Sequence, residues 1–199
     1  MKAESLPLLL KELKLPAFAR HYLPMGETAR ADTWGHADYL AALCEREVAD
    51  RYQRRVHKWT REAQLPTGKT FATLQGERLG KKAQGQLATL QHSNDWALRA
   101  DNVVLVGPSG TGKTHIAAAL SHALIEQGVR CRMFSAVALV QLLQQAKRDL
   151  DLLTAMTRLD KYRVVIIDDI GYVKKTDAET QVLFEFIAHR YESGSLIIT

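Results

Sequence analysis

The sequence predicts an α/β protein in which a parallel sheet flanked by helices follows a helical domain at the N-terminus. From about residue 101 onward, short apolar runs alternate with segments of helical periodicity, which is typical of parallel strands covered on both faces. Before residue 66, apolar side chains recur at helical spacing instead. The expected organisation is a helical domain over 1–66, a connector over 67–100 and a sheet domain over 101–199.

Two helices are expected in the N-terminal domain. The first carries four leucines at helical spacing from Leu6 to Leu13, and Pro16 ends it. The second covers roughly residues 37–64, where apolar residues follow an i, i+4 stripe, and Leu65-Pro66 closes it. The following segment mixes glycines with short apolar stretches, which predicts a connector with some helix.

The sheet domain is expected to contain strands and helices in alternation. The strands are the short apolar runs Val103–Val106, Cys131–Ser135, Val164–Ile167 and Leu196–Ile198. The helices are the longer periodic segments Thr114–Glu126, 137–160 and Asp177–Glu192.

The composition is that of a globular protein, with 46% hydrophobic and 25% charged residues. No apolar run approaches the roughly 20 residues that a membrane helix needs, so no membrane partner is expected. Cys44 and Cys131 fit no metal or redox spacing, and reduced thiols suit a cytoplasmic protein. The formal net charge of +5 permits an anionic partner.

The segment after the first strand fits Gly-x-x-x-x-Gly-Lys-Thr, the phosphate-binding loop. Its members are Gly107, Pro108, Ser109, Gly110, Thr111, Gly112, Lys113 and Thr114, followed by His115. Glycines let several backbone N–H groups turn toward one anion, and the positive end of the following helix adds to their field. Lys113 is expected to reach the β- and γ-phosphates of a bound triphosphate, and the Thr114 hydroxyl to ligate Mg²⁺. His115 is expected to be a structural or phosphate-side neighbour rather than a general base.

A second motif supports the first, because the apolar run Val164–Ile167 is followed by Asp168 and Asp169. Ligands bind at the carboxyl ends of parallel strands, so this pair is expected to face the phosphate loop from the adjacent strand. Asp168 is placed to hold Mg²⁺, and Asp169 to orient or deprotonate the attacking water. The alternative to a nucleotide site is a glycine-rich turn beside an acidic strand end. That alternative does not explain why Lys113 and Thr114 stand at the spacing that the loop motif requires.

A shorter segment, Thr67-Gly68-Lys69-Thr70, repeats the tail of the loop motif. No glycine stands at position 63, and no apolar strand precedes the segment. It is therefore predicted to be a turn or linker.

Three segments carry a wider resemblance: Gly-Pro-Ser-Gly-Thr-Gly-Lys-Thr-His at 107–115, Ile-Ile-Asp-Asp-Ile-Gly-Tyr at 166–172 and Ser-Leu-Ile-Ile-Thr at 195–199. They resemble the IstB family of transposition helper ATPases, which is similar to the helicase loader DnaC and the initiator DnaA within the AAA+ ATPases. The stretches Leu10–Pro16 and Ala63–Phe71 also look like this family. The resemblance therefore covers essentially the whole chain.

The resemblance implies a P-loop AAA+ ATPase that assembles on double-stranded DNA as a homo-oligomer and recruits or activates the transposase of a mobile element. In this family the loop from Gly107 to Thr114 would bind ATP, and Thr114 and Asp168 would handle Mg²⁺. Asp169 stands where many AAA+ proteins have a catalytic glutamate. The segment 137–160 is long enough for the additional helix of initiator-type modules, which faces DNA in relatives and would present Lys147 and Arg148.

The resemblance also implies that C-terminal segments of the family are missing, so the sequence is expected to be either a fragment of a longer gene or a truncated copy. In AAA+ proteins the strand that begins at Leu196 ends in a polar sensor residue, and a helix with an arginine finger follows later. Neither is expected here, and the sheet would lack the strand that flanks the phosphate-loop strand. Nucleotide binding would survive such a truncation better than turnover.

A basic helix face offers a further candidate DNA surface. Its members are Arg51, Arg54, Arg55, Lys58 and Arg61. These cations could contact phosphates, but a solvated helix face explains them equally well. Two other functions stay open: a DnaC-like helicase-loader adaptor that uses ATP as a switch, and a truncated remnant that retains only nucleotide binding.

Overall fold

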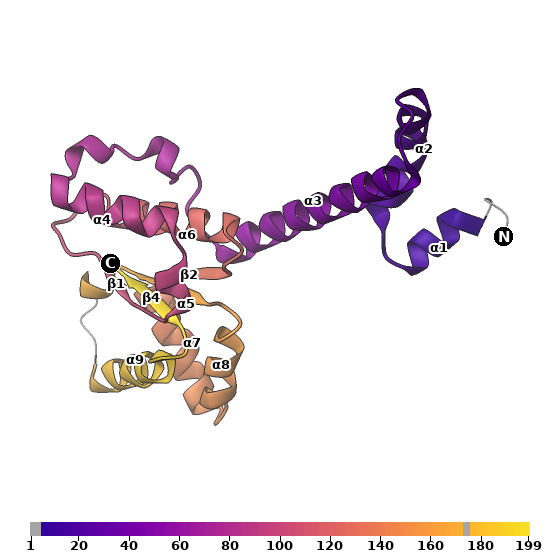
Figure 1. Ribbon diagram of the computed structural model, residues 1–199. Coiled ribbons are helices and arrows are strands. Elements are labelled where there is room, and N and C mark those ends of the chain that lie inside the picture. Colours follow the sequence, from indigo (N-terminus) through magenta and orange to yellow (C-terminus); the bar gives the residue numbers. More distant parts are fainter. Residues whose placement is uncertain (1–4, 173–175) are drawn as a thin grey trace. The chain divides into compact units, whose positions relative to one another are not determined.

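The computed structural model describes residues 5–172 and 176–199. The chain forms two compact units, one up to His57 and one from Lys58 onward, and the long helix α3 (His36–Ala63) contains the point of division (Figure 1). The domain boundaries expected at residues 66 and 100 stay predictions. Within the described ranges, none of the helices combines the length and apolar character that crossing a bilayer requires.

The first unit contains α1 (Leu6–Glu12), α2 (Pro16–Ala31) and the beginning of α3. The sequence pattern does not predict α2, because Pro24 and Gly26 fall inside it and both residue types disfavour a helix interior. Pro16 begins this helix, since proline at the first helical turn needs no N–H partner and already has a helical φ.

Glu47 on α3 holds the start of α2. Its side chain is buried, and Oε2 accepts the N–H of Ala17 at 2.8 Å. Arg51 and Arg54 lie against Oε1, at 2.8 and 3.4 Å. Burial raises the pKa of the Glu47 carboxyl, but the hydrogen bonds from Arg51, Ala17 and Phe18 and the charge of Arg51 all lower it, and the net pKa lies below its ordinary value. The carboxylate also satisfies an amide that has no partner within its own helix.

The second unit contains a four-stranded sheet in which all neighbouring strands are parallel. Its strands are β1 (Val103–Val104), β2 (Cys131–Ser135), β3 (Val164–Asp168) and β4 (Ser195–Ile198), in the order β1-β4-β3-β2. The expected α/β fold with a parallel sheet is confirmed.

Two details of the sheet differ from expectation. The strand predicted over Val103–Val106 ends at Val104, because the chain leaves the ladder toward the glycine loop, although the N–H of Leu105 still donates to Ile198. The acidic pair does not follow the strand adjacent to β1, since β4 lies between β1 and β3.

Helices cover both faces of the sheet (Figure 1). On one face, α6 (Lys113–Glu126) packs against β2 and β3, and α4 (Lys81–His92) packs on α6. The other face is covered by α7 (Ala136–Arg148), α8 (Leu152–Leu159) and α9 (Asp177–Arg190). The connector also holds the short helices η2 (Phe71–Thr73), η3 (Gly76–Arg78) and α5 (Asp95–Leu98).

The segment 137–160, expected to be helical, is interrupted between α7 and α8. Leu150 has a φ of +56° and is 95% exposed, so it cannot belong to either helix. The expectation of helix throughout this segment is therefore wrong at residues 149–151.

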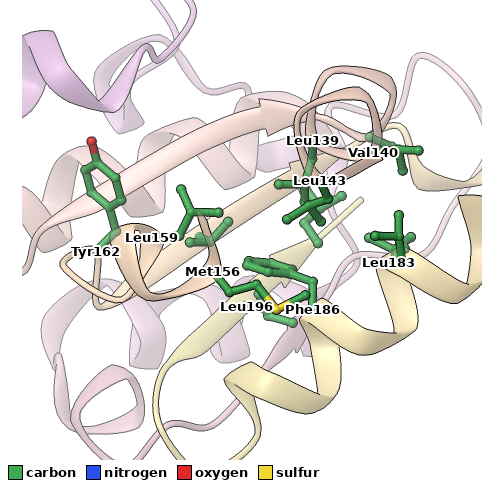
Figure 2. Close-up of a cluster of buried hydrophobic side chains, with 13 residues drawn as sticks. Leu139, Val140, Leu143, Met156, Leu159, Tyr162, Leu183, Phe186 and Leu196 are labelled. Carbon is green, nitrogen blue, oxygen red and sulfur yellow. The ribbon is translucent and has the colours of Figure 1, made fainter. Parts of the chain in front are cut away.

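Figure 2 shows the core beneath α7, α8 and α9. Leu139, Leu143 and Phe186 are completely buried, and Met156 and Leu196 lie beside them. Full burial of one such side chain contributes about 1.5–3 kcal/mol relative to leaving it exposed. This cluster packs the helices onto β3 and β4 and so supports the strands whose ends form the candidate site.

Glu47→Gln is expected to destabilise the first unit by about 1–3 kcal/mol, because the amide cannot neutralise the arginines around it. Amide hydrogen exchange at Ala17 and thermal unfolding of the full chain measure the effect. The wild-type pKa is depressed by folding, so the carboxylate's contribution is complete above its unfolded pKa and declines as the pH falls below it. Glu45→Gln, on an exposed carboxylate of the same helix, is the control. Equal acid sensitivity in wild type and Glu47→Gln would contradict this role.

Candidate nucleotide-binding site

The glycine-rich segment forms an exposed loop between β1 and the first turn of α6. Gly110 and Gly112 have φ values of +79° and +89°, which residues with a side chain rarely adopt. A Cβ on Gly107 would lie 3.1 Å from the hydroxyl of Thr111, which itself donates to the carbonyl of Pro108 at 2.8 Å. The loop leads into the N-terminus of a 14-residue helix, α6. Unpaired N–H groups and the helix dipole favour an anion at this end.

Lys113 places a positive charge against this loop. Its Nζ donates to the carbonyl oxygens of Gly107 and Pro108, at 3.0 Å each. A phosphate oxygen is a stronger acceptor for an ammonium group than a neutral carbonyl, because charge-assisted hydrogen bonds are roughly twice as strong. The ammonium is thus held where a phosphate in the loop could engage it.

The first turn of α6 meets the end of β3 through one hydrogen bond. The hydroxyl of Thr114 donates to Oδ1 of Asp168 at 2.9 Å, although 54 positions separate them in the sequence. Hydroxyl and carboxylate oxygens are ligands that Mg²⁺ prefers, and this ion commonly takes its other ligands from phosphates and water. The structure therefore brings together the two residues that sequence reasoning assigns to the metal.

Asp169 lies between β3 and the short helix η4 (Ile170–Tyr172). It is exposed and has a φ of +60°, a left-handed conformation that aspartate and asparagine tolerate better than most residues. The chain turns sharply after Asp168 as a result, and the Asp169 carboxylate remains open to solvent.

Thr199 is a site residue that sequence reasoning missed. It follows β4, and its hydroxyl donates to Oδ1 of Asp168 at 2.6 Å. The signal was a polar residue directly after the apolar run Leu196–Ile198, the same arrangement that identified Asp168.

His115 contacts the connector. Its Nε2 lies 2.9 Å from the carbonyl oxygen of Thr70 and 3.2 Å from the hydroxyl of Thr73. Thr73 in turn donates to the carbonyl of Gly68, which has a φ of +76°. The segment that repeats the tail of the loop motif thus forms a turn beside α6, as the sequence predicts.

Most of the candidate DNA-binding cations have acidic or amide neighbours. On α3, Arg51 and Arg54 contact Glu47, and Lys58 lies 4.0 Å from Glu62. On α7, Lys147 pairs with Glu185 at 2.8 Å, and Arg148 donates to Gln145 at 2.6 Å. Arg55 stacks over the Tyr52 ring at 5.6 Å, and Arg61 is exposed. The side chains of Arg51, Arg54 and Lys58 are still more than half exposed, so these contacts do not bury their charge.

A family model described as IstB-like ATP binding protein matches residues 8–199. The chain is 39% identical over 194 residues to an insertion sequence ATP-binding protein of Sinorhizobium fredii, spanning 98% of this chain and 65% of that protein. It is 31% identical over 198 residues to the ATP-binding protein of insertion sequence IS21 from Pseudomonas aeruginosa, spanning 98% of this chain and 73% of the relative. The resemblance to the IstB family is confirmed.

Two solved structures share their fold with part of this chain. The DnaC helicase loader superposes with a TM-score of 0.53 at 22% identity, covering 59% of this chain and 68% of DnaC. AMPPCP-bound DnaA from Aquifex aeolicus superposes with a TM-score of 0.54 at 17% identity, covering 68% of this chain and 43% of DnaA. At these identities the likeness shows the fold alone, a parallel sheet flanked by helices.

Lys113→Ala is expected to lower the affinity for Mg-ATP by at least about 100-fold, because the loop loses the ammonium that its carbonyls hold in place. Titration with a fluorescent ATP analogue measures the change. Lys69→Ala is a matched control, since Lys69 follows a glycine and precedes a threonine as Lys113 does, but without the preceding strand and loop. Equal losses in the two variants would show that the loop has no special role.

Proposed function

Because this chain belongs to the IstB-like ATP-binding protein family, we propose that it binds and hydrolyses ATP as a helper protein of DNA transposition. The observation that carries this proposal is the 2.9 Å contact between Thr114 and Asp168, which sets a metal-binding pair beside the Lys113 loop. The names of its relatives, ATP-binding proteins of insertion sequences, support the biological setting.

ATP is proposed to bind with its phosphates against the backbone N–H groups between Gly107 and Thr114. The Thr114 hydroxyl can offer a lone pair to Mg²⁺ while its O–H still donates to Asp168, so both residues can serve one cation. When bound, Mg²⁺ neutralises charge on the β- and γ-phosphates. Lys113 adds a second positive charge from the loop side.

For hydrolysis, Asp169 is the proposed base. The residue follows Asp168 directly and is exposed, which supports a position beside the proposed metal site where water has access. It would accept a proton from the water that attacks the γ-phosphorus, while Lys113 stabilises the charge that develops on the phosphate oxygens.

Asp169→Asn is expected to leave ATP affinity near the wild-type value and to slow hydrolysis by about 100-fold or more, because the amide cannot accept the proton. Asparagine tolerates the left-handed backbone, so the turn should persist. Steady-state phosphate release and equilibrium ATP binding separate the two effects. Glu192→Gln is the control, since Glu192 is also an exposed acid with a φ of +60°. Unchanged hydrolysis in Asp169→Asn would remove this residue from the mechanism.

The proposed partners are double-stranded DNA and the transposase of the same mobile element, with a homo-oligomer of this protein in the cytoplasm as the working form. The net charge of +5 and the exposed cations of α3 support attraction to a polyanion. Arg61 and Lys147 are the cations we expect to reach phosphates, the second by exchanging Glu185 for DNA.

A helicase-loader adaptor is the second candidate, because the fold also matches DnaC. The insertion-sequence relatives favour the transposition role, since they match 98% of the chain at up to 39% identity. A remnant that only binds nucleotide is the third candidate, and a melting temperature that rises with Mg-ATP in a protein that hydrolyses no ATP and retains no partner would favour it.

A pull-down with the full chain as bait distinguishes the first two candidates. With Mg-ATP present, the transposase encoded by the same element is expected to be retained, and the host replicative helicase is not. Lys113→Ala bait should lose the transposase, because the interaction is expected to need bound nucleotide. Retention of the helicase instead would favour the adaptor function.

A further inference from the structure

Thr199 forms hydrogen bonds with the turn that contains Asp168 and Asp169. Its backbone N–H donates to Ile167 at 3.1 Å, and its carbonyl accepts from Ile170 at 3.0 Å. Its hydroxyl accepts the N–H of Asp169 at 3.0 Å and donates to Oδ1 of Asp168 at 2.6 Å. The residue is 8% exposed, so little water competes for these bonds.

The hydroxyl of Thr199 therefore constrains both the backbone at Asp169 and the carboxylate of Asp168. By accepting the amide of Asp169, it helps to hold that residue at a φ of +60°, which would otherwise be a strained conformation. By donating to Oδ1 of Asp168, it orients the carboxylate together with the hydroxyl of Thr114, which donates to the same oxygen at 2.9 Å. The two donors come from different elements, α6 and the end of β4, so the carboxylate is held by both.

We propose that Thr199 is a positioning residue for the Mg²⁺ site, and this inference rests on the proposed function. The Thr199 hydroxyl holds the Asp168 carboxylate in its metal-binding orientation before the cation arrives. A ligand that is held in place by a second hydrogen bond needs less ordering when the metal binds. Its effect should therefore appear in the share of nucleotide affinity that Mg²⁺ provides.

Two substitutions of Thr199 separate the hydroxyl from the methyl group. Thr199→Val keeps the shape of the side chain and removes the hydroxyl, whereas Thr199→Ser keeps the hydroxyl and removes the methyl. For each protein, the affinity for a fluorescent ATP analogue is measured with Mg²⁺ and with EDTA. The ratio of the two affinities reports the contribution of the cation, independently of turnover.

Thr199→Val is expected to lower this ratio by about tenfold, within the range that loss of a second-shell partner of a metal ligand causes. Its affinity in EDTA should match wild type, because the phosphate loop is untouched. Thr199→Ser should keep the wild-type ratio. In an Asp168→Asn background, Thr199→Val should change the ratio no further, because the group that it orients no longer carries charge.

An unchanged ratio in Thr199→Val would overturn the proposal, and so would an equal drop in Thr199→Ser, which would point to packing of the methyl group. Thermal unfolding of each variant identifies loss of the fold, and if Thr199→Val does not fold, Thr199→Ala compared with Thr199→Ser removes the same hydroxyl and decides the question. Failure of the proposed function looks different, since wild-type protein would then bind no ATP analogue with or without Mg²⁺.

Discussion

The hydrogen bond between Thr114 and Asp168 depends on the direction of the strands. Because all four strands are parallel, their carboxyl ends lie at one edge of the sheet, and both the glycine loop and the acidic turn emerge there. β4 separates the two strands concerned, so its own end reaches the same place and delivers Thr199. A reversed β3 would place Asp168 at the far edge, and the loop would have no acidic partner.

The strands were predictable because buried parallel strands are continuous apolar runs, and β2 coincides with the predicted Cys131–Ser135. The order of the strands across the sheet was not predictable, because an apolar run does not indicate which strands will lie beside it. That order depends on how the helices pack on the two faces. Local rules also failed where tertiary contacts override them. The helix α2 forms despite Pro24 and Gly26, because Glu47 from another helix satisfies its N-terminus.

The candidate site divides in the same way. The phosphate loop is a local motif, in which glycine positions, lysine and threonine lie within eight residues, so the sequence predicts all of it. The contacts that surround it are long-range: 45 positions separate His115 from Thr70, and 31 separate Thr199 from Asp168. The surroundings of a charged side chain also depend on long-range contacts, which the sequence does not show. Sequence spacing shows that Arg51 lies one turn from Glu47, but not that this carboxylate is buried at the start of another helix.

The backbone after β3 also bears on why an aspartate stands at position 169. A left-handed conformation costs most residues roughly 1–2 kcal/mol, and short polar side chains such as aspartate and asparagine occupy it more readily. Because the hydroxyl of Thr199 ties the Asp169 amide into this conformation, an aspartate strains the turn less than most residues would. The contact between Thr199 and the end of β3 therefore links the geometry of this turn to the type of residue that it accepts.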